Sequence, residues 1–235
     1  MSAQTVNNWT SNSLNANAVP VPANVRNAPL SADVITEYDR VLAYGGHIHR
    51  EMRGKVFRDS QGRVRTETEQ PNPWTGAEQL ARITIQDPAR HFVIHLDPRT
   101  RTATICRMGQ TPIAKDVASA TGISLPHSAS TKTTLLKSED LGTKFFDGVA
   151  ATGTRTTRAF DGEVMENGRP VVMVTESWFA HDLQIVVLSE TDDNQSGRDS
   201  MKLANIVRVE PNPQLFAIPP DYTLKESSLA KAIDK

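Results

Sequence analysis

Four histidines form two pairs whose spacing suits metal binding. His47 and His49 are two residues apart, and His91 and His95 are four apart. Alternate residues of a β-strand project from the same face, so each pair shares a face if its segment is a strand. Neutral imidazoles bind zinc or copper, and tetrahedral zinc needs three or four ligands. The pairs predict a metal site if their strands lie together, and ordinary surface histidines if they do not.

Two other patterns match known motifs only in part. Asp192, Asn194 and Gly197 have the spacing of a calcium-loop opening, but Leu203 stands where the bidentate carboxylate belongs. The tip of a hairpin is the better interpretation of this segment. Residues 228–231 match Ser-x-x-Lys without its companion motifs, which indicates a chance match. We therefore expect no catalytic residues and no bound cofactor.

Apolar side chains give a second kind of candidate site. Phe92, Ile94 and Leu96 alternate along one segment and share a face if that segment is a strand. Trp178 and Phe179 are large aromatics that would suit an apolar groove for a lipid-like ligand. Ordinary packing in a core or at a sheet edge is the alternative for the two aromatics.

Tight turns and short strands are the elements that would position these residues. Residues 82–107 hold two Asp-Pro pairs, Asp87-Pro88 and Asp97-Pro98, between runs rich in β-branched and aromatic residues. Asp caps a turn with its side chain, and Pro presets φ and cannot donate to a ladder. The segment predicts strand, turn, strand, turn, strand. Because this pattern recurs along most of the chain, we expect a mainly β protein, a curved antiparallel sheet or half-barrel with one or two short helices.

The expected domain organisation is a single β domain with two extensions. Residues 1–29 are rich in Asn, Ala, Ser and Pro and predict an extended N-terminal arm. Residues 30–225 form the antiparallel domain, interrupted by a long excursion at 109–138 that is rich in Ser and Thr. Residues 226–235 are a C-terminal tail.

Composition limits the classes of function. The chain has 235 residues, a formal net charge of −1 and 38% apolar residues, which suits a sheet with one wet face. The near-neutral charge argues against a general role on nucleic acid or an anionic membrane. The single cysteine excludes an intrachain disulfide, and no run approaches the roughly 20 apolar residues of a membrane span. No signal peptide is recognised, as expected of an exported chain after its removal or of a cytoplasmic one.

One run resembles a signature of exported bacterial β-rich proteins of uncharacterised function. It is VFRDSQGRVR at residues 56–65, followed by Asp87-Pro88 and by LDPRTRTA at residues 96–103. Residues 140–158, 176–187 and 210–224 are similar too. The resemblance covers most of residues 30–224 and implies a location outside the cytoplasm. At the fold level these proteins distantly resemble the outer-membrane lipoprotein-carrier half-barrels, in which a curved antiparallel sheet cradles an apolar ligand or peptide.

Three hypotheses follow for the function. The first is a non-enzymatic periplasmic or extracellular carrier that holds an apolar ligand or a protein partner's segment on its sheet. The second is a structural or self-assembling subunit, because an unpaired sheet edge accepts an added strand and the N-terminal arm is a candidate donor. The third is a metal-dependent enzyme built on the four histidines.

Overall fold

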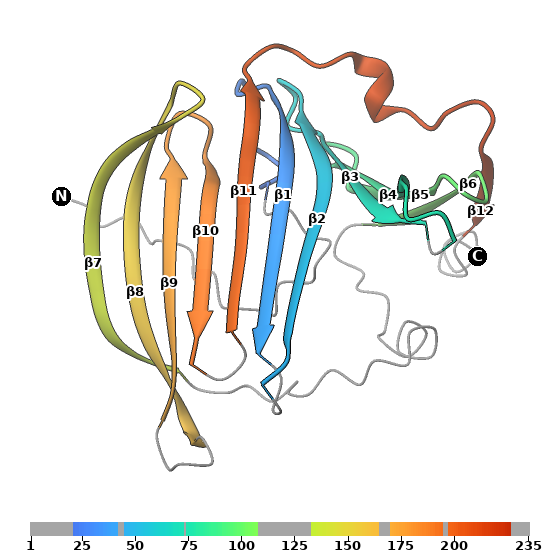
Figure 1. Ribbon diagram of the computed structural model, residues 1–235. Helices are drawn as coiled ribbons and strands as arrows, with labels where there is room; N and C mark the ends of the chain where they lie inside the picture. Colours follow the sequence, from blue (N-terminus) through green and yellow to red (C-terminus); the bar gives the residue numbers. More distant parts are fainter. Residues whose placement is uncertain are drawn as a thin grey trace, which may run out of the picture.

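The computed structural model describes residues 21–41, 45–72, 74–107, 133–164, 170–194 and 197–226. Its strands form one sheet of 12 strands in the order β12-β6-β5-β4-β3-β2-β1-β11-β10-β9-β8-β7 (Figure 1). Their bounds are β1 Leu30–Val41, β2 His47–Arg58, β3 Val64–Pro71, β4 Glu78–Asp87, β5 Phe92–Asp97, β6 Thr102–Arg107, β7 Thr133–Phe146, β8 Val149–Val164, β9 Pro170–Ala180, β10 Ile185–Asp193, β11 Gly197–Val207 and β12 Thr223–Glu226.

The first strand of the chain, β1, lies in the middle of the sheet, and the strands after it are added in two groups, one on each side of β1. Strands β1 to β6 follow one another to one side, whereas β7 lies at the opposite edge and β8 to β11 return to pair with β1. Every pairing is antiparallel except that of β12 with β6. The predicted curved antiparallel sheet is confirmed, and β3 to β6 curl away from the upright strands (Figure 1). The helical content of the described residues is one 3₁₀ turn, η1 Pro213–Phe216.

The two Asp-Pro turns are built in the same way, and they confirm the predicted order of three strands. Asp87 Oδ1 accepts a hydrogen bond from the backbone N–H of Arg90 at 3.1 Å, and Asp97 Oδ1 accepts one from Thr100 at 3.1 Å. Each turn closes on a residue with positive φ, which is His91 at 56° in the first. The expectation that His91 lies on a strand with His95 is therefore wrong, because the left-handed backbone that ends the turn falls on His91.

A large set of apolar side chains, the main cluster, joins β1, β2, β3 and β11 to β8, β9 and β10. Its strand residues are buried with at most 9% exposure. A second cluster lies on β4, β5 and β6 and is completed by Phe216 of η1. The members of the main cluster are Val21, Ala28, Leu30, Ala32, Val34, Val56, Val64, Val149, Ala151, Trp178, Ala180, Leu183, Ile185, Val187, Met201, Leu203 and Ile206.

The second cluster lies on the opposite face of the sheet from the β1–β3 part of the main cluster. Val64 pairs with Arg58 and belongs to the main cluster, whereas the next residue, Arg65, pairs with Ile85 of the second cluster. Adjacent residues of a strand project to opposite faces, and directly paired residues project to the same face. The buried face therefore changes sides between β3 and β4.

The segment before β1 packs onto the main cluster. Val21 and Ala28 are buried there, at 5% and 9% exposure. The backbone N–H of Asn27 donates to the carbonyl of Ser60 in the β2–β3 turn at 3.0 Å. The rest of the expected arm lies outside the described residues, as do residues 109–132 of the expected excursion. Strand β7 begins at Thr133, within the stretch expected as excursion.

Candidate functional site

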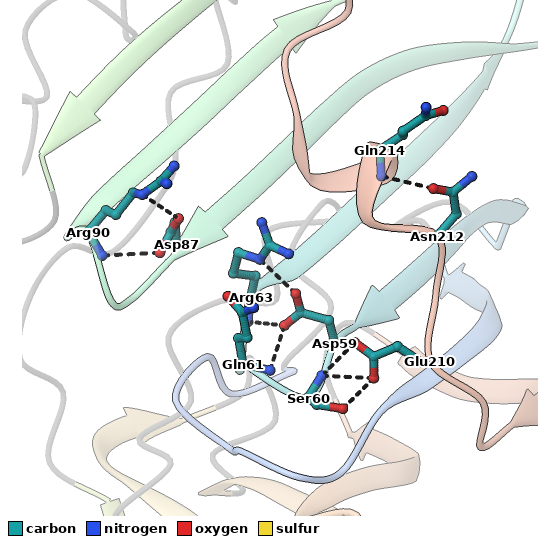
Figure 2. A network of polar contacts seen from close by, with 9 residues as sticks. All are labelled: Asp59, Ser60, Gln61, Arg63, Asp87, Arg90, Glu210, Asn212 and Gln214. Carbon is teal, nitrogen blue, oxygen red and sulfur yellow. Dashed lines mark hydrogen bonds and ion pairs between the residues drawn. The ribbon is translucent and has the colours of Figure 1, made fainter.

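The turn between β2 and β3 is organised by a buried carboxylate. Asp59 is 1% exposed. Its Oδ1 accepts hydrogen bonds from the backbone N–H of Gln61 at 3.0 Å and of Arg63 at 2.9 Å, and its Oδ2 accepts from Arg63 Nε at 2.6 Å (Figure 2). Charge-assisted hydrogen bonds of this kind compensate the loss of water around a buried charge. The turn is thus a fixed platform for the residues on either side of it.

Residues 208–222, which we call the strap, run from the end of β11 to β12 and are held by this platform (Figure 1). The backbone N–H of Ser60 donates to the Glu210 carboxylate at 3.2 Å, and the Ser60 hydroxyl donates to it as well (Figure 2). Arg65, 8% exposed, donates from Nη1 to the carbonyl of Leu215 at 2.8 Å. The strap is therefore anchored by one carboxylate and one carbonyl.

The apolar side of the strap covers the second cluster. Phe216 is 6% exposed and lies with the buried Ile83, Ile85 and Leu96. The Arg63 guanidinium lies 4.9 Å from the centroid of the Phe216 ring, within the range of a cation–π contact. The chain thus places its own strap, with the η1 turn, on the β4–β6 face.

Arg58 is a cation inside the main cluster. It is 0% exposed, and it pairs in register with two buried apolar residues, Leu30 on β1 and Val64 on β3. Its Nε donates to the carbonyl of Ala28 at 2.9 Å, and its Nη2 donates to the carbonyl of Leu183 at 2.5 Å. One side chain therefore joins β2 to the segment before β1 and to the β9–β10 turn.

The third nitrogen of Arg58 is unsatisfied. Nη1 is buried and has no hydrogen-bond partner among the described residues. A buried donor left without a partner costs about 1–3 kcal/mol. Burial alone lowers the pKa of the Arg58 guanidinium to about 10, with no carboxylate of the described residues opposing this shift. The cation has no counter-ion within the part of the chain that the structure describes.

Trp178 is packed within the main cluster at 1% exposure. The Phe146 ring lies 5.8 Å from it between centroids, and Lys144 Nζ lies 4.4 Å from its ring centroid. A Cβ placed on Gly153 would lie 2.7 Å from Trp178 ring atoms, so the indole requires glycine there. Phe179 is half-buried, with its ring in edge contact with His181 at 5.0 Å between centroids.

The β5 residues predicted to bind a ligand share a face, as expected, but they lie apart from Trp178. Leu96 is 1% exposed and Ile94 packs against the second cluster, whereas Phe92 is half-buried at the start of the strand. The structure therefore divides the predicted apolar residues between two clusters. Whether Phe92, Ile94, Leu96, Trp178 and Phe179 contact a ligand stays a prediction.

The four histidines are not brought together. His47 and His49 lie on β2, and His49 Nδ1 donates to Asp39 Oδ1 at 2.6 Å. His95 pairs with Thr84 on β4, on the sheet face opposite to that of His49. Within the described ranges no three His, Cys, Asp or Glu side chains lie close enough to hold a metal ion. Asp192 and Gly197 lie at the adjoining ends of β10 and β11, which pair antiparallel as a hairpin requires.

A pocket of 140 Å³ lies over β1, β10 and β11. Its lining is charged, and Arg198 Nη2 donates to Glu190 Oε2 across it at 2.7 Å. Such a lining does not suit an apolar ligand. The remaining lining residues are Glu37, Asp39 and Ser200.

Sequence reasoning missed the burial of Arg58 and the strap. The available signal was the position of Arg58, two residues after Val56 on a strand whose alternate residues are apolar. An arginine on the apolar side of a strand indicates a buried charge with a structural or binding role. The sequence offered no comparable signal for the strap.

Comparisons with known proteins find similarity among solved structures alone. No family model and no curated protein matches the sequence. Among solved structures, lipoprotein LprF of Mycobacterium bovis is 11% identical, with 80% of this chain and 90% of that chain covered and a TM-score of 0.32. Lipoprotein LppX of Mycobacterium tuberculosis is 11% identical, with 79% and 90% covered and a TM-score of 0.36.

A LolA-superfamily protein of Nitrosomonas europaea is 7% identical, with 81% of this chain and 90% of that chain covered and a TM-score of 0.35. At such identities and TM-scores these structures do not assign a ligand. No helix among the described residues is long and apolar enough to cross a membrane.

Proposed function

We propose that this protein is a non-enzymatic binding or carrier module that holds an apolar ligand, or an apolar segment of a partner, against its curved sheet. The observation that carries the proposal is the main cluster. It extends the apolar character of one open sheet over seven strands, from Val64 on β3 to Ala151 on β8. Its members are buried, and buried apolar side chains along a sheet are the kind of lining that a site for a lipid-like ligand requires.

The strap supports the same proposal from the other face. Leu215 and Phe216 of the η1 turn, with Ile218 after it, pack as a short apolar segment on the second cluster. This intrachain contact supports the proposal, because its apolar anchors and few polar contacts are those that a partner's segment would need. The ligand of the main cluster remains to be identified, and a periplasmic or extracellular location is part of the proposal.

The test uses the full chain and a neutral apolar probe. Purified protein is titrated with N-phenyl-1-naphthylamine, whose fluorescence rises in an apolar site, and is extracted with organic solvent for lipid analysis by mass spectrometry. We expect saturable fluorescence and a co-purifying lipid in stoichiometric amount. Absence of both would overturn the carrier function.

An assembly role is the second candidate, and β7 is the observation that favours it. This strand is the outermost of the sheet on its side. Leu135 and Phe145 on it are 51% and 75% exposed, and an edge strand is a ready template for an added strand. Deleting residues 1–20 tests whether the arm is the donor. A monomer before and after deletion, by analytical ultracentrifugation, would exclude this role.

A further inference from the structure

The buried guanidinium of Arg58 has one donor nitrogen that no described residue uses. Two of its nitrogens are occupied by the carbonyls of Ala28 and Leu183, while Nη1 is buried without a partner among the described residues. Arginine carries its charge at every physiological pH and presents its donors in one plane. The two carbonyl contacts fix that plane, so the direction of the free nitrogen is set before any ligand arrives.

The surroundings of Arg58 are apolar. Leu30 and Val64 pair with it on the neighbouring strands, and Val56 precedes it on the same face of β2. All three are at most 1% exposed. A charge in such surroundings attracts an opposite charge far more strongly than a charge at the surface does, because little water screens it.

The nearby carboxylate is already used. Asp59 is the next residue in the chain, but its oxygens accept from Gln61 and Arg63 on the other side of the turn. Arg53 lies on the same strand as Arg58 but projects to the opposite sheet face, and its Nε donates to the Glu51 carboxylate at 2.6 Å. Arg58 is thus a buried arginine whose only described acceptors are backbone carbonyls.

We propose that Arg58 is the headgroup-recognition residue of the main cluster, and that the ligand is an amphiphile with one anionic group, a carboxylate or a phosphate, attached to an apolar chain. The anionic oxygen accepts from Arg58 Nη1, and the apolar chain inserts among the side chains of the main cluster, which are at most 9% exposed and must part to admit it. This inference rests on the proposed carrier function and narrows its ligand class. It also accounts for a cation at a position where an apolar residue would otherwise be more favourable.

The test compares two probes that differ only in charge. The full-length protein is titrated with cis-parinaric acid and with its methyl ester, both followed by fluorescence. We expect the acid to bind at least about tenfold more tightly, since a hydrogen bond to a charged group is roughly twice as strong as a neutral one. Equal binding of acid and ester would overturn the inference while leaving the carrier function intact. Binding of neither probe would overturn both.

Two variants locate the effect. Arg58→Met keeps the length of the side chain and removes the charge, so we expect it to bind acid and ester equally. Arg53→Met is the matched control, with the same change of net charge on the same strand, and we expect the wild-type preference to persist in it. Persistence of the preference in Arg58→Met would overturn the assignment to Arg58.

A measurement on the wild-type protein covers the case in which Arg58→Met does not fold. In protein labelled with ¹⁵N-arginine, the Arg58 Nε–H resonance is expected to shift on addition of the acid and to stay unchanged with the ester. Acetate, added at the same concentration as the acid, separates an amphiphile from a free carboxylate. Displacement of bound acid by acetate, or an unmoved Arg58 resonance, would contradict the inference.

Discussion

The two apolar clusters show how one sheet uses its faces differently. The main cluster is built from strands that come together from both halves of the chain, with Leu30 of β1 and Leu203 of β11 among its members. The second cluster lies on three consecutive strands and is closed by a strap from the end of the chain. The first is therefore a product of long-range strand pairing, and the second depends on one segment being held in place. A substitution in the main cluster should therefore destabilise the whole sheet, whereas one in the second cluster should mainly detach the strap.

The largest expected effect is on the main cluster. Trp178→Ala removes an indole that is 1% exposed, and we expect the free energy of unfolding to fall by about 3–5 kcal/mol, because the cavity cannot fully close. Urea denaturation followed by circular dichroism measures this. Trp74→Ala is the control, since Trp74 is 93% exposed, and a change within about 0.5 kcal/mol is expected. Equal losses in both variants would contradict the placement of Trp178.

A substitution in the second cluster should mainly loosen the strap that covers it. Phe216→Ala removes the main apolar anchor of the strap, which is 6% exposed. We expect a global loss of about 2 kcal/mol, below the roughly 3–5 kcal/mol of such a truncation in a closed core, because the strap can detach while the sheet persists. Limited proteolysis should then cut within residues 208–222. Leu224→Ala, at a position that is 54% exposed, serves as the control and should leave the strap resistant.

The polar anchor of the strap should matter less than its apolar anchor. Glu210→Gln removes the charge that accepts from the backbone N–H and the hydroxyl of Ser60. Because Glu210 is exposed, we expect a loss of about 0.5–1 kcal/mol in urea denaturation. Gln214→Ala is a suitable comparison, since the structure uses the backbone N–H of Gln214 and not its side chain. A larger effect of Glu210→Gln than of Phe216→Ala would reverse the order of the two anchors.

The smallest effect is a difference in titration between two histidines on opposite faces. The hydrogen bond to the Asp39 carboxylate raises the pKa of His49 above its usual 6.5, whereas burial and then the charge of Arg82 lower the pKa of His95 below 6.5. The contribution of His49 to stability is therefore present below pH 6.5 and lost as the pH rises through its folded pKa. That of His95 is present above pH 6.5 and lost as the pH falls through its folded pKa.

Imidazole resonances in NMR spectra recorded between about pH 5 and 8 check both directions, since this range brackets an ordinary histidine pKa. Asp39→Asn should return the His49 midpoint toward 6.5 and leave the His95 midpoint in place. Coincident midpoints in the wild-type protein would contradict the two environments.

The strands and turns of this fold were predictable from sequence because their causes are local. Asp87 and Asp97 fold back onto backbone N–H groups a few residues away, and the flanking residues alternate as a strand requires. His91 was misplaced because the residue that takes positive φ at the end of such a turn carries no strong sequence mark when it is not glycine.

The candidate site was less predictable because it depends on pairing between distant strands. Phe92, Ile94 and Leu96 were correctly placed on one face, yet the sequence does not say that this face is covered by residues 208–222. Trp178 and Leu96 both look like groove residues in the sequence, but they belong to different clusters. Arg58 looks like one more basic residue of a hairpin until Leu183, far along the chain, is placed against it.

The sequence by itself determined that this protein is an antiparallel β protein with tight Asp-led turns, because side-chain alternation and turn hydrogen bonds act within a few residues. Only the tertiary structure decided which face of each strand is buried and where the buried face changes sides, between Val64 and Ile85. The physical reason is that a strand has two equivalent faces, and the choice between them is made by the segments that cover it. These segments come from distant parts of the chain, and their position is fixed by contacts such as those of Arg58 and Arg65.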